Sequence, residues 1–191
     1  LMGYYSALPD KRILLFLLNG YKYFYEHLED QPLEPVAAAC VGDLLQVVLW
    51  LHGLTNMPFL MELAGKLLEQ GLDWTAFCHT MPLKHPMSRH IPWHKLQKGM
   101  AGEDDNLRGY YTQEYHQYHA TNVASALKTP ALHHVMTGGI KHENAFDVGF
   151  EKLMKHHGVA YGMFTGDCLL NRNAPTQGTN LGAVVALISS L

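Results

Sequence analysis

The chain has 191 residues, of which 48% are hydrophobic, 16% charged and 10% aromatic. This composition argues against disorder and coiled coil, and a chain of this length buries about 70% of the surface of its unfolded form, so we expect one globular domain. The formal net charge is −3 and no run of Lys or Arg stands out, which gives no support for nucleic acid or an anionic membrane surface as a partner.

Three helices are predicted in the first part of the chain. Residues 11–30 carry apolar side chains at helical spacing, and Pro32 and Pro35 follow as stop signals. Residues 36–54 repeat this apolar spacing and predict a second helix. A third helix is predicted over 58–70, because Pro58 suits a first turn and Gly71 suits a C-terminal stop.

Residues 80–109 have no periodic apolar face. Five Pro and Gly residues between Thr80 and Gly109, together with the acidic stretch Glu103 to Asp105, interrupt this segment. We predict a flexible loop here. Loops of this length in a compact domain are usually lids or binding loops, and a mobile excursion is the alternative interpretation.

Helical patterns resume at residues 120–136, with a kink predicted at Pro130, and at 143–157, before Gly158. A loop is predicted over 165–178, followed by an apolar run to the end. No segment alternates apolar and polar residues convincingly enough to predict a strand.

The two halves of the chain resemble each other. Residues 49–71 and 132–158 share a plan of helix end, turn, second helix and Gly. A repeated helix–turn–helix unit needs stacked neighbours to bury its apolar face. We therefore predict an all-α fold of antiparallel helical hairpins, arranged as a solenoid or a closed toroid.

The three cysteines, Cys40, Cys78 and Cys168, have no spacing typical of a metal finger or a redox pair, and we interpret them as reduced thiols. No stretch reaches the roughly 18 apolar residues that a membrane span needs. The chain begins with Leu1 and stops at Leu191 inside an apolar run. We expect both ends to be internal to a longer product, so the compartment is unknown.

Three ordered blocks, residues 42–77, 119–132 and 156–191, resemble the catalytic domain of glycoside hydrolase family 127, the β-L-arabinofuranosidase type. The last block, which contains GMFTGDCLLNRNAPTQGTNLGAVVALISSL, is similar to the family pattern GMFSGDEHL followed by PSQGTELCAVVE. The resemblance implies that residues 1–191 are one partial catalytic domain, an internal portion of an (α/α)6 toroid. It also implies that further helices and β-domains lie beyond it.

The resemblance also implies a site and a chemistry. Family members use a zinc-bound cysteine as nucleophile, held with two further cysteines and a glutamate, and a second glutamate as acid/base. A zinc-bound thiol is deprotonated and nucleophilic at neutral pH, while a carboxyl group can protonate the leaving oxygen and then activate water. The implied substrate is an arabinose-containing glycan.

This chain departs from that pattern. Cys168 stands at the acid/base position, and Asn180 and Gly182 stand at two zinc-ligand positions. A thiol lacks the second oxygen of a carboxylate, Asn offers only a neutral carbonyl and Gly offers no side chain, whereas a closed zinc site needs four good donors. A further acidic position is Ala186, and the family's remaining cysteine pair is expected beyond Leu191. The expectation is that no zinc cofactor is retained and that this chain does not hydrolyse glycosides.

Three positions match family residues and are candidates for sugar binding. His119 could hydrogen-bond a sugar hydroxyl or be a satisfied histidine at a helix start. Asp43 could bind sugar, be a buried polar anchor or lie on an exposed face, and Asp167 is expected to shape its turn through its side chain. His116 and His119 have a spacing that could chelate a metal, although packing is the stronger interpretation. Tyr110, Tyr111, Tyr115 and Tyr118 could stack on a sugar ring or pack in the core.

Two functions from other classes remain open. The chain could be a carbohydrate-binding pseudoenzyme that keeps the cleft without the chemistry. It could instead be a helical-repeat interaction protein, which would present a large exposed apolar patch and no interior cleft.

Overall fold

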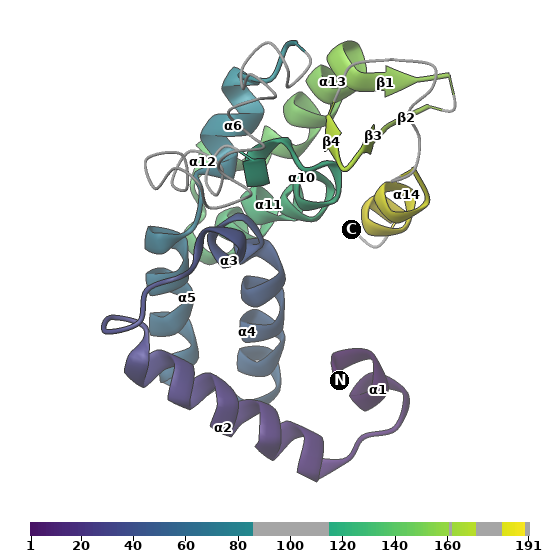
Figure 1. Cartoon of the computed structure of the whole chain (residues 1–191). Helices are drawn as coiled ribbons and strands as arrows, with labels where there is room; N and C mark the ends of the chain where they lie inside the picture. The colour runs from purple at the N-terminus through teal and green to yellow at the C-terminus, as the bar shows by residue number, and fades with distance from the viewer. Residues whose placement is uncertain (86–114, 161, 171–180, 190–191) are drawn as a thin grey trace, which may run out of the picture.

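The computed structural model of the chain describes residues 1–85, 115–160, 162–170 and 181–189 (Figure 1). The described part is mostly helical, as predicted. Its helices are α1 (Met2–Ala7), α2 (Lys11–His27), α3 (Pro35–Ala39), α4 (Val41–Thr55), α5 (Pro58–Gln70), α6 (Trp74–Thr80), α10 (Ala120–Ala126), α11 (Lys128–Thr137), α12 (Ile140–Glu143), α13 (Ala145–His157) and α14 (Leu181–Ser189). Most of the predicted loop 80–109 lies outside the described residues.

Helix α2 presents the apolar face that the sequence predicts. Asp10 caps its start by accepting a hydrogen bond from the Arg12 N–H at 2.8 Å. Leu28, just after the helix, is fully buried. The other predicted positions are partly buried and pack against the core: Leu14, Leu17, Leu18, Tyr21, Phe24 and Tyr25. In Figure 1, α2 runs across one end of the upright pair α4 and α5.

The helical hairpin of α4 and α5 lies at the centre of the N-terminal half (Figure 1). Its turn at Asn56 has a φ of 51°, in the left-handed region that a helix C-terminus often uses. The bounds predicted for α5, residues 58–70, are confirmed. The single helix predicted over 36–54 is wrong at its start, because the helix is interrupted at Cys40 and forms α3 and α4. Val36, expected on the apolar face, is 49% exposed.

The predicted helix over 120–136 is also divided. Helix α10 ends at Ala126 and α11 begins at Lys128, so the break lies ahead of Pro130. A proline ring clashes with the carbonyl four residues earlier, which here is that of Ala126, and proline is tolerated in a first turn. Likewise, the pattern predicted over 143–157 is divided at Asn144 into α12 and α13.

Two short hairpins follow α13, where no strand was predicted. Strand β1 (Gly158–Val159) pairs with β2 (Met163–Phe164), and β3 (Gly166–Asp167) pairs with β4 (Leu169–Leu170), both antiparallel. Strands of two residues are too short to show alternation, which explains why the sequence pattern missed them.

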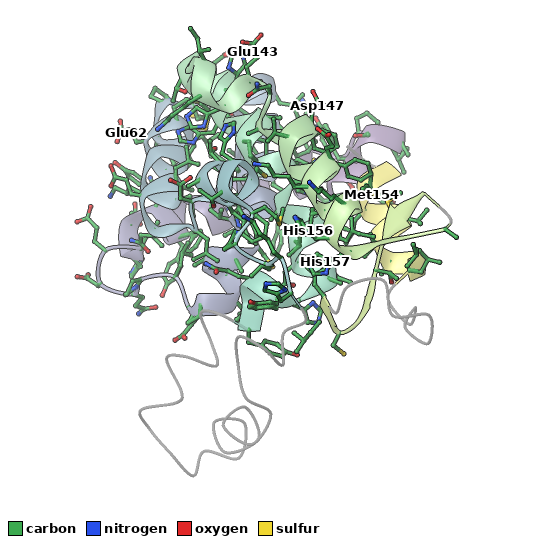
Figure 2. The ribbon with its side chains drawn as sticks, turned by 90° about the horizontal axis from the view of Figure 1, so that it is seen from above. Glu62, Glu143, Asp147, Met154, His156 and His157 are labelled. Carbon is green, nitrogen blue, oxygen red and sulfur yellow. The ribbon has the colours of Figure 1, made fainter. Side chains whose placement is uncertain are left out.

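One apolar core joins the two halves. Its large, fully buried side chains come from both halves of the chain and include Leu45 and Leu51 of α4, Leu60, Leu63 and Leu67 of α5, Leu127, Leu153 of α13 and Phe164 of β2. Trp74 is 2% exposed and its indole N–H donates to the Ala39 carbonyl at 3.0 Å. At the far end of α13, His157 is buried and bonds the Leu83 carbonyl at 2.5 Å (Figure 2). Within the described ranges, no helix is long and apolar enough to cross a membrane.

Candidate functional site

The β3–β4 hairpin places its tip against the start of α10. The tip residue, Cys168, accepts a hydrogen bond at its carbonyl from the Ala120 N–H at 2.8 Å, and His119 forms an isolated antiparallel bridge with Leu169. Backbone N–H groups in the first turn of a helix have no partner within the helix, so this contact satisfies one of them. Two predicted site residues from different sequence blocks, His119 and Cys168, are thereby brought together.

His119 is the residue that precedes α10, and its imidazole is half-buried. Its Nδ1 lies 2.7 Å from the Thr121 hydroxyl. Burial lowers the pKa of His119 below its ordinary value. The ring is therefore neutral at pH 7 and has one donor and one acceptor nitrogen, which is the form that hydrogen-bonds an uncharged hydroxyl.

A polar network lies beside His119. The side-chain nitrogen of Asn122, Nδ2, is 3.2 Å from Nδ1 of His116. The Cys40 thiol lies 3.9 Å from the side-chain oxygen of Asn122, Oδ1. Burial, followed by the proximity of His119, lowers the pKa of His116. Tyr115 packs edge-on to His116, with ring centroids 5.4 Å apart. This cluster links the start of α4 to the start of α10.

Asp43 is engaged between helices. Both carboxylate oxygens accept from the Ser125 hydroxyl at 2.8 Å, and Oδ1 is 2.5 Å from Nζ of Lys128. Lys128 also donates to the Gln46 amide oxygen at 2.9 Å. This arrangement uses Asp43 as a polar anchor between helices, although its side chain is 50% exposed and not buried.

These contacts share one register. The pairs Cys40–Asn122, Asp43–Ser125 and Gln46–Lys128 each join residues 82 positions apart. The residue number increases from one pair to the next in both partners of each pair. Helix α4 therefore runs in the same direction as α10 and the start of α11. A helix rises 1.5 Å per residue, so the three pairs form a polar stripe about 9 Å long. Each member is three residues from the next, so the stripe keeps to one face of each helix.

The other predicted site residues lie in different parts of the chain. Asp167 lies in β3 and pairs with Leu169 of β4. Cys168 is exposed and has a φ of 64°. Gly182 lies exposed on α14, and Asn180, Tyr110 and Tyr111 fall outside the described residues. Tyr118, by contrast, is 2% exposed and belongs to the core.

The donor set offers little for zinc. Gly182 has no side chain, and the Cys168 thiol lies at an exposed hairpin tip. Within the described part of the chain, no three His, Cys, Asp or Glu side chains come together in a way that could hold a metal ion. We therefore assign no chemical step to a metal.

A cleft of about 500 Å³ opens at the Gln46–Lys128 end of the polar stripe, where α4, α11, α12, α13 and α14 meet. Its polar lining side chains are Gln46, Lys128, Glu143 and Asp147, and Phe146 with Leu132 supplies apolar surface. This volume is within the usual range for small-ligand sites. Figure 2 shows Glu143 and Asp147 at the beginning of the α12–α13 segment, far from His156 and His157 at its end.

Sequence reasoning missed the polar stripe. A signal for it was present, because polar or thiol side chains recur every third position in two segments: Cys40, Asp43 and Gln46 at the start of α4, and Asn122, Ser125 and Lys128 across the α10–α11 junction. Spacing within each helix did not indicate the partner helix, since that depends on contacts 82 residues apart.

Comparisons with protein-family models, with curated proteins and with solved structures found no match to this chain.

Proposed function

We propose that the chain is a portion of a carbohydrate-active (α/α) toroid of the β-L-arabinofuranosidase type, and that the end carrying His119 binds sugar without hydrolysing glycosides. The observation that carries this proposal is the hydrogen bond from Ala120 to the Cys168 carbonyl. It joins two of the sequence blocks on which the family resemblance depends, at the residues that the resemblance assigns to the site.

The helix arrangement supports the toroid. In such a toroid, inner helices run parallel to one another and each is followed by an antiparallel outer helix. The register of 82 residues between α4 and α10–α11 has this parallel sense. Helix α5 follows α4 and α13 follows α11, as the repeated plan in the sequence requires.

The polar groups at this end suit a neutral, hydroxyl-rich ligand. His119 and His116 are held neutral by burial, which lowers the pKa of each, and Asn122 adds an amide. The Tyr115 ring lies 5.8 Å from the His119 ring, measured between centroids. Sugars are bound by such combinations of neutral hydrogen-bonding groups and an aromatic surface.

The absence of hydrolysis follows from residue chemistry. A thiol is a weaker acid than a carboxyl group and has no second oxygen, so it does not replace a carboxyl group as the acid that protonates a leaving oxygen. Cys168 stands at that position in the resemblance, and Gly182 supplies no ligand for zinc.

The test is a calorimetric titration of the purified protein with oligosaccharides that contain L-arabinose, paired with a turnover assay on an aryl β-L-arabinofuranoside. We expect binding heat, a loss of affinity of at least about tenfold in His119→Ala, and no turnover. The matched control is His52→Ala, on α4 away from the hairpin. Absence of heat would overturn sugar binding, and turnover that a chelator abolishes would overturn the loss of activity.

A helical-repeat interaction protein is the second candidate, and an exposed apolar surface favours it. The side chains concerned lie on or beside α1 and α2 and are each more than half exposed: Leu1, Tyr4, Leu8, Leu15, Phe16 and Tyr23. Patches of this kind mark interaction sites. Binding of a protein partner that is lost in Phe16→Ser, with no heat from any sugar, would favour this function.

A further inference from the structure

A pair of stacked histidines, of which one is buried and one half-buried, holds α12 against its neighbours, some distance along the chain from His119. His142 on α12 is 3% exposed, and its Nδ1 lies 2.7 Å from the hydroxyl of Thr75 on α6. The ring of His133, on α11, stacks on that of His142 with centroids 3.7 Å apart and planes 28° apart. The His142 imidazole therefore contacts α6 through Thr75 and α11 through His133.

The α11–α12 turn is built closely around this pair. Gly138 has a φ of 66° and ends α11, and a Cβ on Gly139 would lie 2.9 Å from the His142 ring. The Gly139 carbonyl is 3.1 Å from Nδ1 of His134. On the α6 side, Nε2 of His79 lies 2.8 Å from the Lys141 carbonyl. The ring contact and these bonds hold a helix of only four residues.

The charges that face His142 are mostly unfavourable to its protonation. His133 and His134 come from α11 and Lys141 from α12 itself, while Asp73, at the start of α6, has the opposite effect. Burial is the main cause that lowers the pKa of His142, and burial also lowers that of His133, with a further decrease from Lys141. Stacked rings cannot both become charged without strong repulsion.

We propose that His133 and His142 form an acid-sensitive latch, which holds α12 against α6 and α11 while both rings are neutral and releases α12 when the pair is protonated. Glu143, the last residue of α12, and Phe146 and Asp147, in the first turns of α13, line the cleft of about 500 Å³. Release of α12 therefore changes the wall of this cleft. The latch does not depend on the proposed sugar site.

The direction of the effect follows from proton linkage. Well above pH 6.5 the pair is neutral whether α12 is closed or open, so the latch is fully effective. As the pH falls below 6.5, the open form takes up protons that the closed form excludes, and closure weakens. At pH 5.5, one histidine that must stay neutral to close shifts the equilibrium toward opening by about tenfold.

The test is amide hydrogen exchange of the peptide covering residues 136–146, at pH 7.5, 6.5 and 5.5, corrected for the intrinsic pH dependence of exchange. We expect a rise of about tenfold in the corrected rate between pH 7.5 and 5.5, and a rise several-fold smaller in His142→Gln, which keeps a hydrogen-bonding group for Thr75 but has no titratable ring. The matched control is His52→Gln, which should follow the unmodified protein. A pH-independent corrected rate in the unmodified protein overturns the latch.

A second measurement covers the case in which His142→Gln does not fold. Proton NMR of the histidine rings in the unmodified protein should give titration midpoints for His133 and His142 below the ordinary value near 6.5. The amide signals of α12 should change over the same pH range. Ordinary midpoints for both rings overturn the proposal.

Discussion

Lys128 and Asp43 form an ion pair with Nζ and Oδ1 2.5 Å apart, in which the lysine side chain is 13% exposed and the aspartate side chain 50% exposed. The pair lies in the middle of the polar stripe that joins α4 to α10 and α11. Its unequal burial means that the two partners are not equivalent: loss of the carboxylate leaves a nearly buried ammonium, while loss of the lysine leaves a carboxylate that water can reach.

Asp43→Ala should therefore lower the free energy of unfolding by about 1–3 kcal/mol, since the cost of an uncompensated buried charge is reduced here by the remaining bond to Gln46. Urea denaturation measures this. The double variant Asp43→Ala with Lys128→Met should recover part of the loss, because no charge is then left without a partner. An unchanged urea midpoint in the single variant would mean that the pair contributes nothing to stability.

A close helix contact gives a second prediction. A Cβ on Gly149 of α13 would lie 2.5 Å from Sγ and 3.2 Å from Cα of Cys78 on α6, so the helices would have to separate. Gly149→Ala should cost about 1–3 kcal/mol of unfolding free energy. Gly65→Ala on α5 is the matched control, because no atom lies within 4 Å of its added Cβ, and it should stabilise by up to about 1 kcal/mol. Equal effects of the two substitutions would contradict the packing of α6 on α13.

The elements that the sequence predicted well are those with strong local signals. The apolar face of α2 and the ends of α5 follow from side-chain periodicity, Pro58 and Gly71. Helix α6 was missed because its seven residues, Trp74–Thr80, span too few turns to show a period. The break at Cys40 has no turn residue to mark it, and it coincides with the contact to Asn122.

The candidate site was predictable in part. The resemblance indicated His119 and Cys168, and the structure brings them together through the backbone. The roles of His116, Asn122 and Lys128 depend on which helices pack together, and tertiary contacts of that kind leave no local pattern. Asp43 was a candidate for the site, yet its carboxylate is occupied by Ser125 and Lys128.

The three thiols should differ in reactivity. Cys168 is exposed, whereas burial raises the pKa of Cys78 to about 12, and burial with the nearby Asp43 carboxylate raises that of Cys40. Since the thiolate is the reactive form, alkylation at pH 7.5 should modify Cys168 first and Cys78 last. Peptide mass spectrometry after timed treatment with N-ethylmaleimide measures the order. All three should react at similar rates in urea, and equal rates in the folded protein would contradict the burial of Cys78.

Acid should destabilise the His119 end of the molecule. The pKa values of His116 and His119 are lowered on folding, so below pH 6.5 the unfolded chain binds more protons than the folded one, and stability falls with pH. The urea midpoint should be lower at pH 5.5 than at pH 7.5, and His116→Gln should reduce this difference. The variant His52→Gln should leave it unchanged. A midpoint that rises on acidification would contradict the lowered pKa values of the two histidines.

The last prediction concerns the hairpin that meets α10. A Cβ on Gly166 would lie 2.2 Å from the Leu169 carbonyl oxygen, a backbone atom that cannot move without opening the β3–β4 pair. Gly166→Ala should therefore displace the tip and break the hydrogen bond from Ala120 to the Cys168 carbonyl, which NMR would report as faster exchange of the Ala120 amide. The same substitution at Gly182, where no atom lies within 4 Å of the added Cβ, is the control.

If His119 and the hairpin tip together bind sugar, Gly166→Ala loses the binding heat and Gly182→Ala keeps it. Faster exchange at Ala120 with unchanged sugar binding would separate the hairpin from the proposed site, and His119 would then have to act without it.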